Sequence, residues 1–253
     1  MKAEELVLIE KGNLEVVLDD NKIVLPDSIQ KDIDEHWEGL LRDGNNFKRG
    51  EVFTIKSVEK KDRGTVVELS VSDYAHYLYT QRVGLENKYA CKNLHTSCLI
   101  ETCDEKLVFG RMGRHTAMSG VIQCAGGGLD NDDIKGKNVD LENNIKRELM
   151  EEVGIEAKNK EIVDELRIKY LKYSLDTNKV AAIFVLKLKI DSQEFMRLYD
   201  SFESDCKKKG ELPEFEEIVC LPKNRSEVEE FVQKERDHLN HYMEVLLKSE
   251  ASE

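Results

Sequence analysis

The chain of 253 residues lacks several features that would place it in a specialised class of protein. No stretch approaches the roughly 18 to 20 apolar residues of a membrane-spanning helix, and acidic residues interrupt the start, MKAEELVLIE, where a signal peptide would be apolar. The six cysteines form no CxxC pair, and their spacing matches neither a zinc ribbon nor a disulfide framework. We therefore expect a soluble, cytoplasmic protein with no membrane partner and with reduced, mostly buried thiols.

Positive charge is also scarce. The sequence has 38 Lys and Arg against 51 Asp and Glu, so its formal net charge is −13 at pH 7. A protein this acidic repels a phosphate backbone, and no run of Lys and Arg forms the basic stripe that nucleic-acid binding needs. The composition therefore excludes nucleic acid as a partner. It leaves open whether the acidic residues serve solubility alone or gather to hold a cation.

Proline is rare, with three residues, and no internal repeat or low-complexity tract is visible. Hydrophobic residues make up 40% of the chain, which suits a folded core, and the length fits one large domain or two modest ones. The patterns predict mixed α and β structure, of the α+β class. A change in the pattern of apolar and polar residues near residue 90 predicts a smaller β-rich N-terminal portion, residues 1–92, followed by a larger domain, residues 93–253.

The spacing of apolar residues predicts the individual elements. In the N-terminal portion we expect strands at 6–9, 14–18 and 23–25, a hairpin of 52–58 with 65–71, a helix that is capped by Asp27 or Ser28 and runs to about residue 41, and a short helix near 74–78. In the larger domain we expect strands at 99–100, 107–109, 121–122, 162–175, 181–190 and 217–221, and helices at 140–153, 192–208 and 226–248. A capping-box spacing at Ser226 to Glu229 is expected to open the last helix.

The helix at 140–153 concentrates acidic residues. At about 100° per residue, its apolar positions form one stripe, and three glutamates lie directly beside that stripe. These glutamates are Glu148, Glu151 and Glu152. Carboxylates at this spacing repel one another, and a divalent cation turns the repulsion into attraction. Mg²⁺ takes few protein carboxylates and completes its octahedron with waters and phosphate oxygens. A metal site is therefore one interpretation, and an ordinary solvated acidic helix is the other.

The segment Arg147-Glu148-Leu149-Met150-Glu151-Glu152-Val153-Gly154-Ile155 resembles the second half of the Nudix box, G-x5-E-x7-R-E-U-x-E-E-x-G-U with U aliphatic, the signature of the Nudix hydrolase superfamily. Segments 99–111 and 119–127 resemble the family's strand hairpin and its strand before a Gly-Gly turn. The resemblance covers about residues 95–250. It implies an α/β/α sandwich around a mixed sheet, and hydrolysis of a nucleoside diphosphate linked to another moiety with Mg²⁺, or Mn²⁺, as cofactor.

Two features depart from the family pattern. The position of the box's first Glu, eight residues before Arg147, holds Val139, and the loop after the glycine turn is longer than in the family. The usual role of the missing carboxylate is to orient the arginine. Asp132, Asp133 and Asp140 are the candidates to replace it.

A narrower resemblance extends into the N-terminal portion. The segments 34–37, 45–47, 72–74 and 94–97, together with the Gly-Gly-Gly turn and its long loop, look like the UDP-sugar diphosphatase-like Nudix branch. This implies a nucleotide sugar such as UDP-glucose as substrate, with UMP and sugar 1-phosphate as products. It also implies that residues 1–92 serve substrate binding or formation of a homodimer. An ADP-ribose pyrophosphatase and a catalytically silent, nucleotide-binding regulatory module are the alternatives.

The resemblance also implies roles for single residues. Glu148, Glu151 and Glu152 would be the metal ligands, and Arg147, Glu148 and Glu151 the catalytic residues. The general base is left open between Glu148, Glu151 and a late acid, which would be Glu214, Glu216 or Glu217.

Further candidates flank this helix. Arg111 and Arg114 are predicted to clamp phosphate, with a plain surface location as the alternative. Gly127 and Gly128 are predicted to contact the substrate, because their turn permits close backbone approach. No Gly-Lys-Ser/Thr follows the turn, which excludes a P-loop. His95 and His115 could donate to phosphate or serve only as structural histidines.

Overall fold

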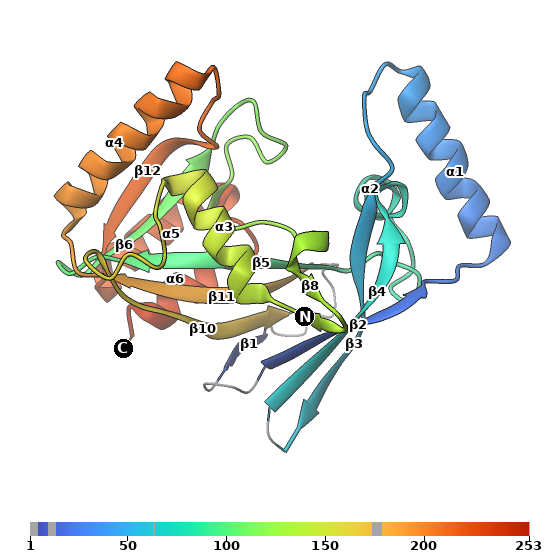
Figure 1. The fold of residues 1–253 in the computed structure, drawn as a ribbon, viewed down its shortest axis with the longest axis horizontal. Coiled ribbons are helices and arrows are strands. Elements are labelled where there is room, and N and C mark those ends of the chain that lie inside the picture. Colours follow the sequence, from blue (N-terminus) through green and yellow to red (C-terminus); the bar gives the residue numbers. More distant parts are fainter. Residues whose placement is uncertain (1–4, 10–13, 63, 174–178, 253) are drawn as a thin grey trace.

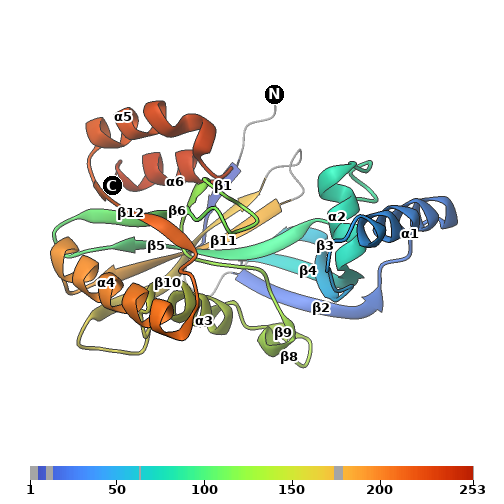
Figure 2. The same ribbon diagram turned by 90° about the horizontal axis from the view of Figure 1, so that it is seen from above.

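A mixed β-sheet runs through the protein, and helices cover both of its faces (Figures 1 and 2). The computed structural model describes residues 5–9, 14–62, 64–173 and 179–252. Helices α3 (Leu141–Val153) and α4 (Ser192–Lys209) cover one face, and α5 (Arg225–Glu235) and α6 (Met243–Glu250) cover the other. The α/β/α sandwich predicted from the sequence is confirmed.

Twelve strands form the sheet within the described part of the chain. They are β1 (Glu5–Leu8), β2 (Leu14–Lys22), β3 (Glu51–Lys61), β4 (Gly64–Asp73), β5 (Asn93–Glu101), β6 (Lys106–Met112), β7 (Ile122–Gln123), β8 (Ile134–Lys135), β9 (Asn138–Val139), β10 (Val163–Tyr173), β11 (Lys179–Leu188) and β12 (Phe215–Pro222). Their order is β1-β10-β11-β5-β3-β4-β2-β9-β8, and a branch of β6 with β7 and β12 leaves β5. The central pair, β11 and β5, is parallel.

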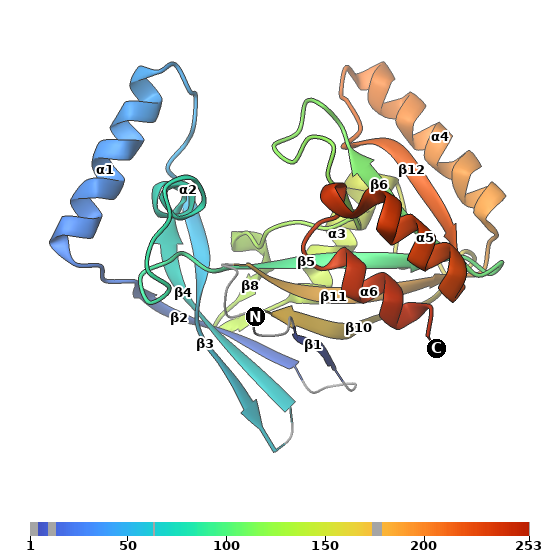
Figure 3. The same cartoon turned by 180° about the vertical axis from the view of Figure 1, so that it is seen from behind.

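The N-terminal portion continues this sheet instead of standing apart from it. Strand β3 joins β5 where Thr54 pairs with Asn93. Helices α1 (Asp27–Arg42) and α2 (Tyr74–Arg82) pack together at the end of the sheet away from α4 (Figures 1 and 3). Their contact is a small apolar cluster that includes Ile33 and Trp37. The division at residue 92 stays a prediction, since the hydrogen-bonded sheet passes across it.

Four local predictions are wrong. Residues 23–25 are not a strand, and α1 begins after Pro26 with no side-chain cap from Asp27 or Ser28. The segment 226–248 is two helices, joined by the 3-10 turn η2 (Arg236–His238), because Leu239 bridges to Ile122 of the sheet and the chain has to turn there. The cap of α5 is Asn224, whose side chain accepts from the backbone N–H of Glu227, so the predicted capping box does not form.

The other predicted elements are found with shifts of a few residues at their ends. The predicted end of the strand at 162–175, beyond Tyr173, lies outside the described residues. All six cysteines are free, and four of them are buried, as predicted; these are Cys91, Cys98, Cys124 and Cys206. Among the described residues, no helix combines the length and apolar character that crossing a membrane requires.

Candidate functional site

Helix α3 begins and ends where the sequence predicts. The side chain of Asp140 accepts from the backbone N–H of Asn143, which caps the first turn. Gly154 ends the helix at φ +69°, a left-handed conformation that suits glycine. The apolar stripe is buried against the sheet and consists of Leu141, Ile145, Leu149 and Val153. This packing fixes the rotation of α3, and therefore the direction of the glutamates beside the stripe.

Two of the three glutamates are buried against the glycine turn. Glu148 is 8% exposed and Glu152 is 3% exposed. The backbone N–H of Gly126 donates to Glu152 at 3.0 Å. A Cβ placed on Gly127 would lie 2.7 Å from the Glu148 carboxyl carbon, so any larger residue there would push that carboxyl group aside. The structure thus brings together residues that are more than twenty positions apart in the sequence.

A fourth carboxylate faces this pair. Burial, and after it the charge of Glu214, raise the pKa of Glu152 to about 9. Burial also raises the pKa of Glu148 to about 7, although the nearby Arg147 guanidinium opposes the shift. Glu214 lies just before β12, where its backbone carbonyl accepts from Gly113 N at 2.7 Å. Among the three late acids, Glu214 is the one beside Glu148 and Glu152, since Glu217 instead binds Arg111.

These residues fit a hard divalent cation. Glu148, Glu151, Glu152 and Glu214 supply only carboxylate oxygens, which Mg²⁺ and Mn²⁺ prefer, and a cation would offset the burial and the mutual repulsion that raise the pKa values of Glu148 and Glu152. As the side chains stand, no three His, Cys, Asp or Glu groups of the described residues close around a common point. A closed cage is not required, because Mg²⁺ is usually held by one or two carboxylates, waters and substrate phosphates.

Arg147 is surrounded by acidic groups. Its guanidinium binds Glu148 at 2.8 Å, Asp130 at 3.0 Å, and Asp133 and Glu151 at 3.4 Å. Asp133 is completely buried, and it also accepts from the side chains of Asn143 and Asn144. Of the three acids considered for the missing carboxylate, Asp133 is the one that reaches Arg147.

Asp130 also binds Arg147, and it was not among the residues predicted from the sequence. This residue caps the 3-10 turn η1 (Asn131–Asp133), and Asp130 and Asp133 form a reciprocal capping box. Local sequence could have indicated this box, because two acids three positions apart have its spacing. They lie at the start of the long loop between Gly128 and Asp140, which is called the insertion below. The box orders the insertion and aims both carboxylates at Arg147.

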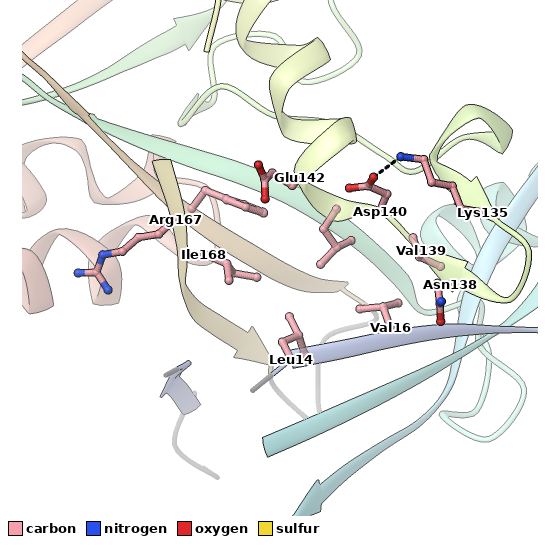
Figure 4. A pocket seen from close by; sticks show the side chains of 11 residues that line it. Leu14, Val16, Lys135, Asn138, Val139, Asp140, Glu142, Arg167 and Ile168 are labelled. Carbon is pink, nitrogen blue, oxygen red and sulfur yellow. Dashed lines mark hydrogen bonds and ion pairs between the residues drawn. The ribbon is translucent and has the colours of Figure 1, made fainter. Parts of the chain in front are cut away.

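The remaining candidates for the missing carboxylate point elsewhere. Asp132 is exposed, and Asp140 pairs with Lys135. Figure 4 shows Asp140 and Lys135 at the rim of a cavity of about 420 Å³ between β2, the insertion and β10. Val139 lines this cavity and is buried in the hydrophobic core. The position that departs from the Nudix pattern therefore has a packing role here.

The two arginines predicted to clamp phosphate differ in their surroundings. Arg111 donates to Glu235 at 2.9 Å, to Glu217 at 3.1 Å and to the Gly120 carbonyl at 3.2 Å, so its guanidinium is already engaged. Arg114 is exposed on the loop after β6. Phosphate binding by either arginine stays a prediction.

The two histidines differ as well. The His95 ring packs against His241 and Tyr242, and desolvation lowers its pKa to about 4. These ring contacts favour the structural alternative for His95. His115 is exposed beside Gly113 and stays a candidate donor.

A second cavity, of about 410 Å³, lies between the N-terminal portion and the larger domain. It is lined by Thr80, Gln81, Met118, Val121, Lys179, Leu239, Asn240 and His241. The loop at 113–121 connects it to the carboxylates, since Gly113 binds Glu214 and the other end of the loop lines the cavity. Its wall thus combines three apolar side chains with five polar or charged ones.

Comparison with known proteins finds no matching family model and no matching curated protein. Nudix proteins are among the solved structures that the chain resembles. The Nudix domain of Shewanella oneidensis NrtR, complexed with ADP ribose, has 12% identity and a TM-score of 0.36, covering 69% of this chain and 95% of that one. MutT protein from Methanosarcina mazei Go1 has 14% identity and a TM-score of 0.36, covering 62% and 91%.

DR0079 from Deinococcus radiodurans has 10% identity and a TM-score of 0.41, covering 62% of this chain and 82% of that one. These TM-scores are too low for the likeness to carry an argument about fold or activity. The Nudix resemblance of this chain therefore rests on its own residues: the motif on α3, the glycine turn against it and the acids around Arg147.

Proposed function

We propose that the protein is a Mg²⁺-dependent Nudix-type hydrolase that cleaves the phosphoanhydride bond of a nucleoside diphosphate linked to another moiety. The burial of Glu148 and Glu152 beside Glu214 carries this proposal. An ordinary solvated helix would leave its glutamates in water, as Glu151 is, with a side chain 59% exposed. Buried carboxylates are costly, and groups with strongly perturbed pKa values cluster at functional sites.

Each residue then has a role. Glu148, Glu151 and Glu152 would hold the cation, which when bound neutralises charge on the diphosphate and lowers the pKa of a water molecule. Arg147 orients Glu148, and the Gly126 N–H orients Glu152. Glu214 is our candidate general base, because it faces the buried pair and is itself exposed enough to accept a proton from water.

The substrate that we favour is a nucleotide sugar such as UDP-glucose, which would yield UMP and sugar 1-phosphate. The short segments of the N-terminal portion that look like the UDP-sugar branch support this choice. The second cavity supports a nucleoside-bearing substrate, since α2 contributes Thr80 and Gln81 to its wall. ADP-ribose is the alternative substrate, and a silent nucleotide-binding module is the alternative function.

One experiment separates these functions. The protein is incubated with Mg²⁺ and UDP-sugars, GDP-sugars, ADP-ribose, dinucleoside polyphosphates or NADH in ¹⁸O-labelled water, and the products are identified by mass. UMP with sugar 1-phosphate supports the first choice, and AMP with ribose 5-phosphate supports ADP-ribose. Binding without turnover of any compound would favour the silent module.

Gly127 provides a direct test of the site. Gly127→Ala should lower kcat by about 10²-fold or more, because the new Cβ displaces the Glu148 carboxyl group, and a 1 Å misplacement can cost this much. Gly128→Ala is the matched change, since a Cβ there meets no atom within 4 Å, and it should cost far less. Equal losses in the two variants would show that the contact with Glu148 is irrelevant.

The raised pKa values also predict how stability depends on pH. The pKa values of Glu148 and Glu152 in the folded state lie above the ordinary 4.5, so folding favours their protonated forms. Their contribution to the free energy of unfolding is therefore fully present below about pH 4.5, and it is lost as the pH rises through 7 and 9. Urea unfolding in EDTA should therefore show wild-type stability falling relative to Glu152→Gln between pH 5 and 9. Mg²⁺ should remove most of this difference in stability. A difference that does not vary with pH would show that the pKa of Glu152 is not raised in the folded protein.

A further inference from the structure

Asn144 is a fully buried amide at the meeting point of three parts of the chain. Its Nδ2 group donates to the Gly128 carbonyl at 2.9 Å and to Asp133 at 2.8 Å. Its Oδ1 accepts from the hydroxyl of Thr96 on β5. Both amide hydrogens are used, and because the Gly128 carbonyl can only accept, the orientation of the amide is defined.

The neighbours of Asn144 on α3 make this position important. Arg147 and Glu148 follow it by three and four residues, so all three lie on adjoining parts of one helix face. Asn144 holds a partner of each: Asp133, which binds Arg147, and the glycine turn, which packs on Glu148. One side chain thus connects the insertion, the glycine turn and the sheet.

The amide does more than fill space. An apolar side chain of similar size would leave the Thr96 hydroxyl, the Gly128 carbonyl and Asp133 without this buried partner, which costs stability. The amide does provide direction, because a satisfied buried network allows one arrangement of its members. Thr96, Asn144 and Asp133 are all completely buried, so water does not compete for these bonds.

We propose that Asn144 is a positioning residue of the hydrolytic site. It clamps the glycine turn to the insertion, so that Arg147 and Glu148 keep a single arrangement in a chain that has Val139 where a carboxylate was expected. This inference rests on the proposed function.

A double-variant cycle of Asn144 with Arg147 tests the proposal. Asn144→Ala should lower kcat by about 10- to 100-fold, as the loss of outer partners of a site typically does, with a much smaller change in KM. Because Asn144 acts partly through Arg147 and partly through the glycine turn against Glu148, the double variant with Arg147→Ala should lose less than the product of the two single losses. Losses that multiply would show that Asn144 acts independently of Arg147 and would overturn the proposal.

Two further variants separate positioning from folding. Thr96→Val removes the hydroxyl that holds the Asn144 oxygen but keeps the shape of the side chain, and it should show a weaker form of the same non-additive loss. Asn143→Ala is the matched control, because it removes one bond to Asp133 at 3.1 Å and none to the glycine turn. Its loss of kcat should be smaller than that of Asn144→Ala, and an equal loss would contradict the clamp.

Hydrogen exchange tests the clamp without any turnover. The backbone N–H of Thr96 donates to the Gly127 carbonyl, so it reports on the attachment of the turn. Asn144→Ala should speed its exchange at least tenfold and leave Ile155 N–H, at the end of α3, unchanged. If the wild-type protein has no hydrolase activity, the proposed function is rejected. The exchange rate of the Thr96 N–H then tests the clamp by itself. Unchanged exchange at residue 96 would reject the clamp.

Discussion

Glu152→Gln should abolish turnover while leaving the fold intact. The glutamine keeps the size of the side chain, and its carbonyl oxygen can still accept from the Gly126 N–H. It removes the negative charge that would hold the cation, and several kcal/mol of lost charge stabilisation correspond to a decrease in kcat of about 10³-fold or more. The rate is measured on the substrate that the product assay identifies, at saturating Mg²⁺.

The same substitution should change how Mg²⁺ affects stability. Wild type should unfold at a higher temperature in Mg²⁺ than in EDTA, because a ligand that binds the folded state stabilises it. Glu152→Gln should lose most of this increase. Glu142→Gln is the matched control, since Glu142 is exposed on the first turn of the same helix and pairs with Lys146. If Glu152→Gln retained activity, or if the control behaved in the same way, the metal assignment would fail.

Asp133→Asn should lower kcat by about 10²-fold, because it removes the buried charge that holds Arg147 and presents an amide to groups that already donate. Asp133 also accepts from the backbone N–H of Asp130, so part of the insertion should loosen. The rate at saturating substrate is the measurement, accompanied by urea unfolding to confirm that the variant is folded.

Two other aspartates are the controls for Asp133. Asp132→Asn changes an exposed side chain and should have little effect on rate or stability. Asp140→Asn changes the side chain that caps α3 and pairs with Lys135. Because asparagine is also a good cap, we expect at most a small loss of stability and no loss of kcat. A fall in kcat for all three variants would mean that the insertion acts through its overall charge, and a fall for Asp140→Asn alone would reassign the missing carboxylate.

The start, the buried face and the end of the acidic helix α3 could be predicted from local sequence. Asp140, the apolar stripe and Gly154 act within a few residues of one another, so spacing alone predicts where α3 begins, which face it buries and where it ends. The hairpin of β3 and β4 is predictable for the same reason. The boundaries that failed, at residues 23–25 and within 226–248, depend on contacts with distant strands, such as the bridge from Leu239 to Ile122.

The acids that surround Arg147 could be identified only from the tertiary structure. Local sequence marks Asp132, Asp133 and Asp140 as equivalent, because they differ only in their position along one insertion. The fold separates them: Asp133 is buried against Arg147, Asp132 remains in solvent, and Asp140 turns to Lys135. In the same way, Glu214 joins the site because β12 pairs with β6, which brings it to Gly113.

The sequence was thus sufficient for the motif, for the helix that carries it and for proposing a class of chemistry, since these depend on residue types at short spacing. The tertiary structure decided which acids are buried together, and burial is what raises the pKa values of Glu148 and Glu152 above their ordinary range. Desolvation depends on everything packed around a group, including Gly126, Gly127 and Glu214 from distant segments. The spacing of residues on one helix contains no information about that packing.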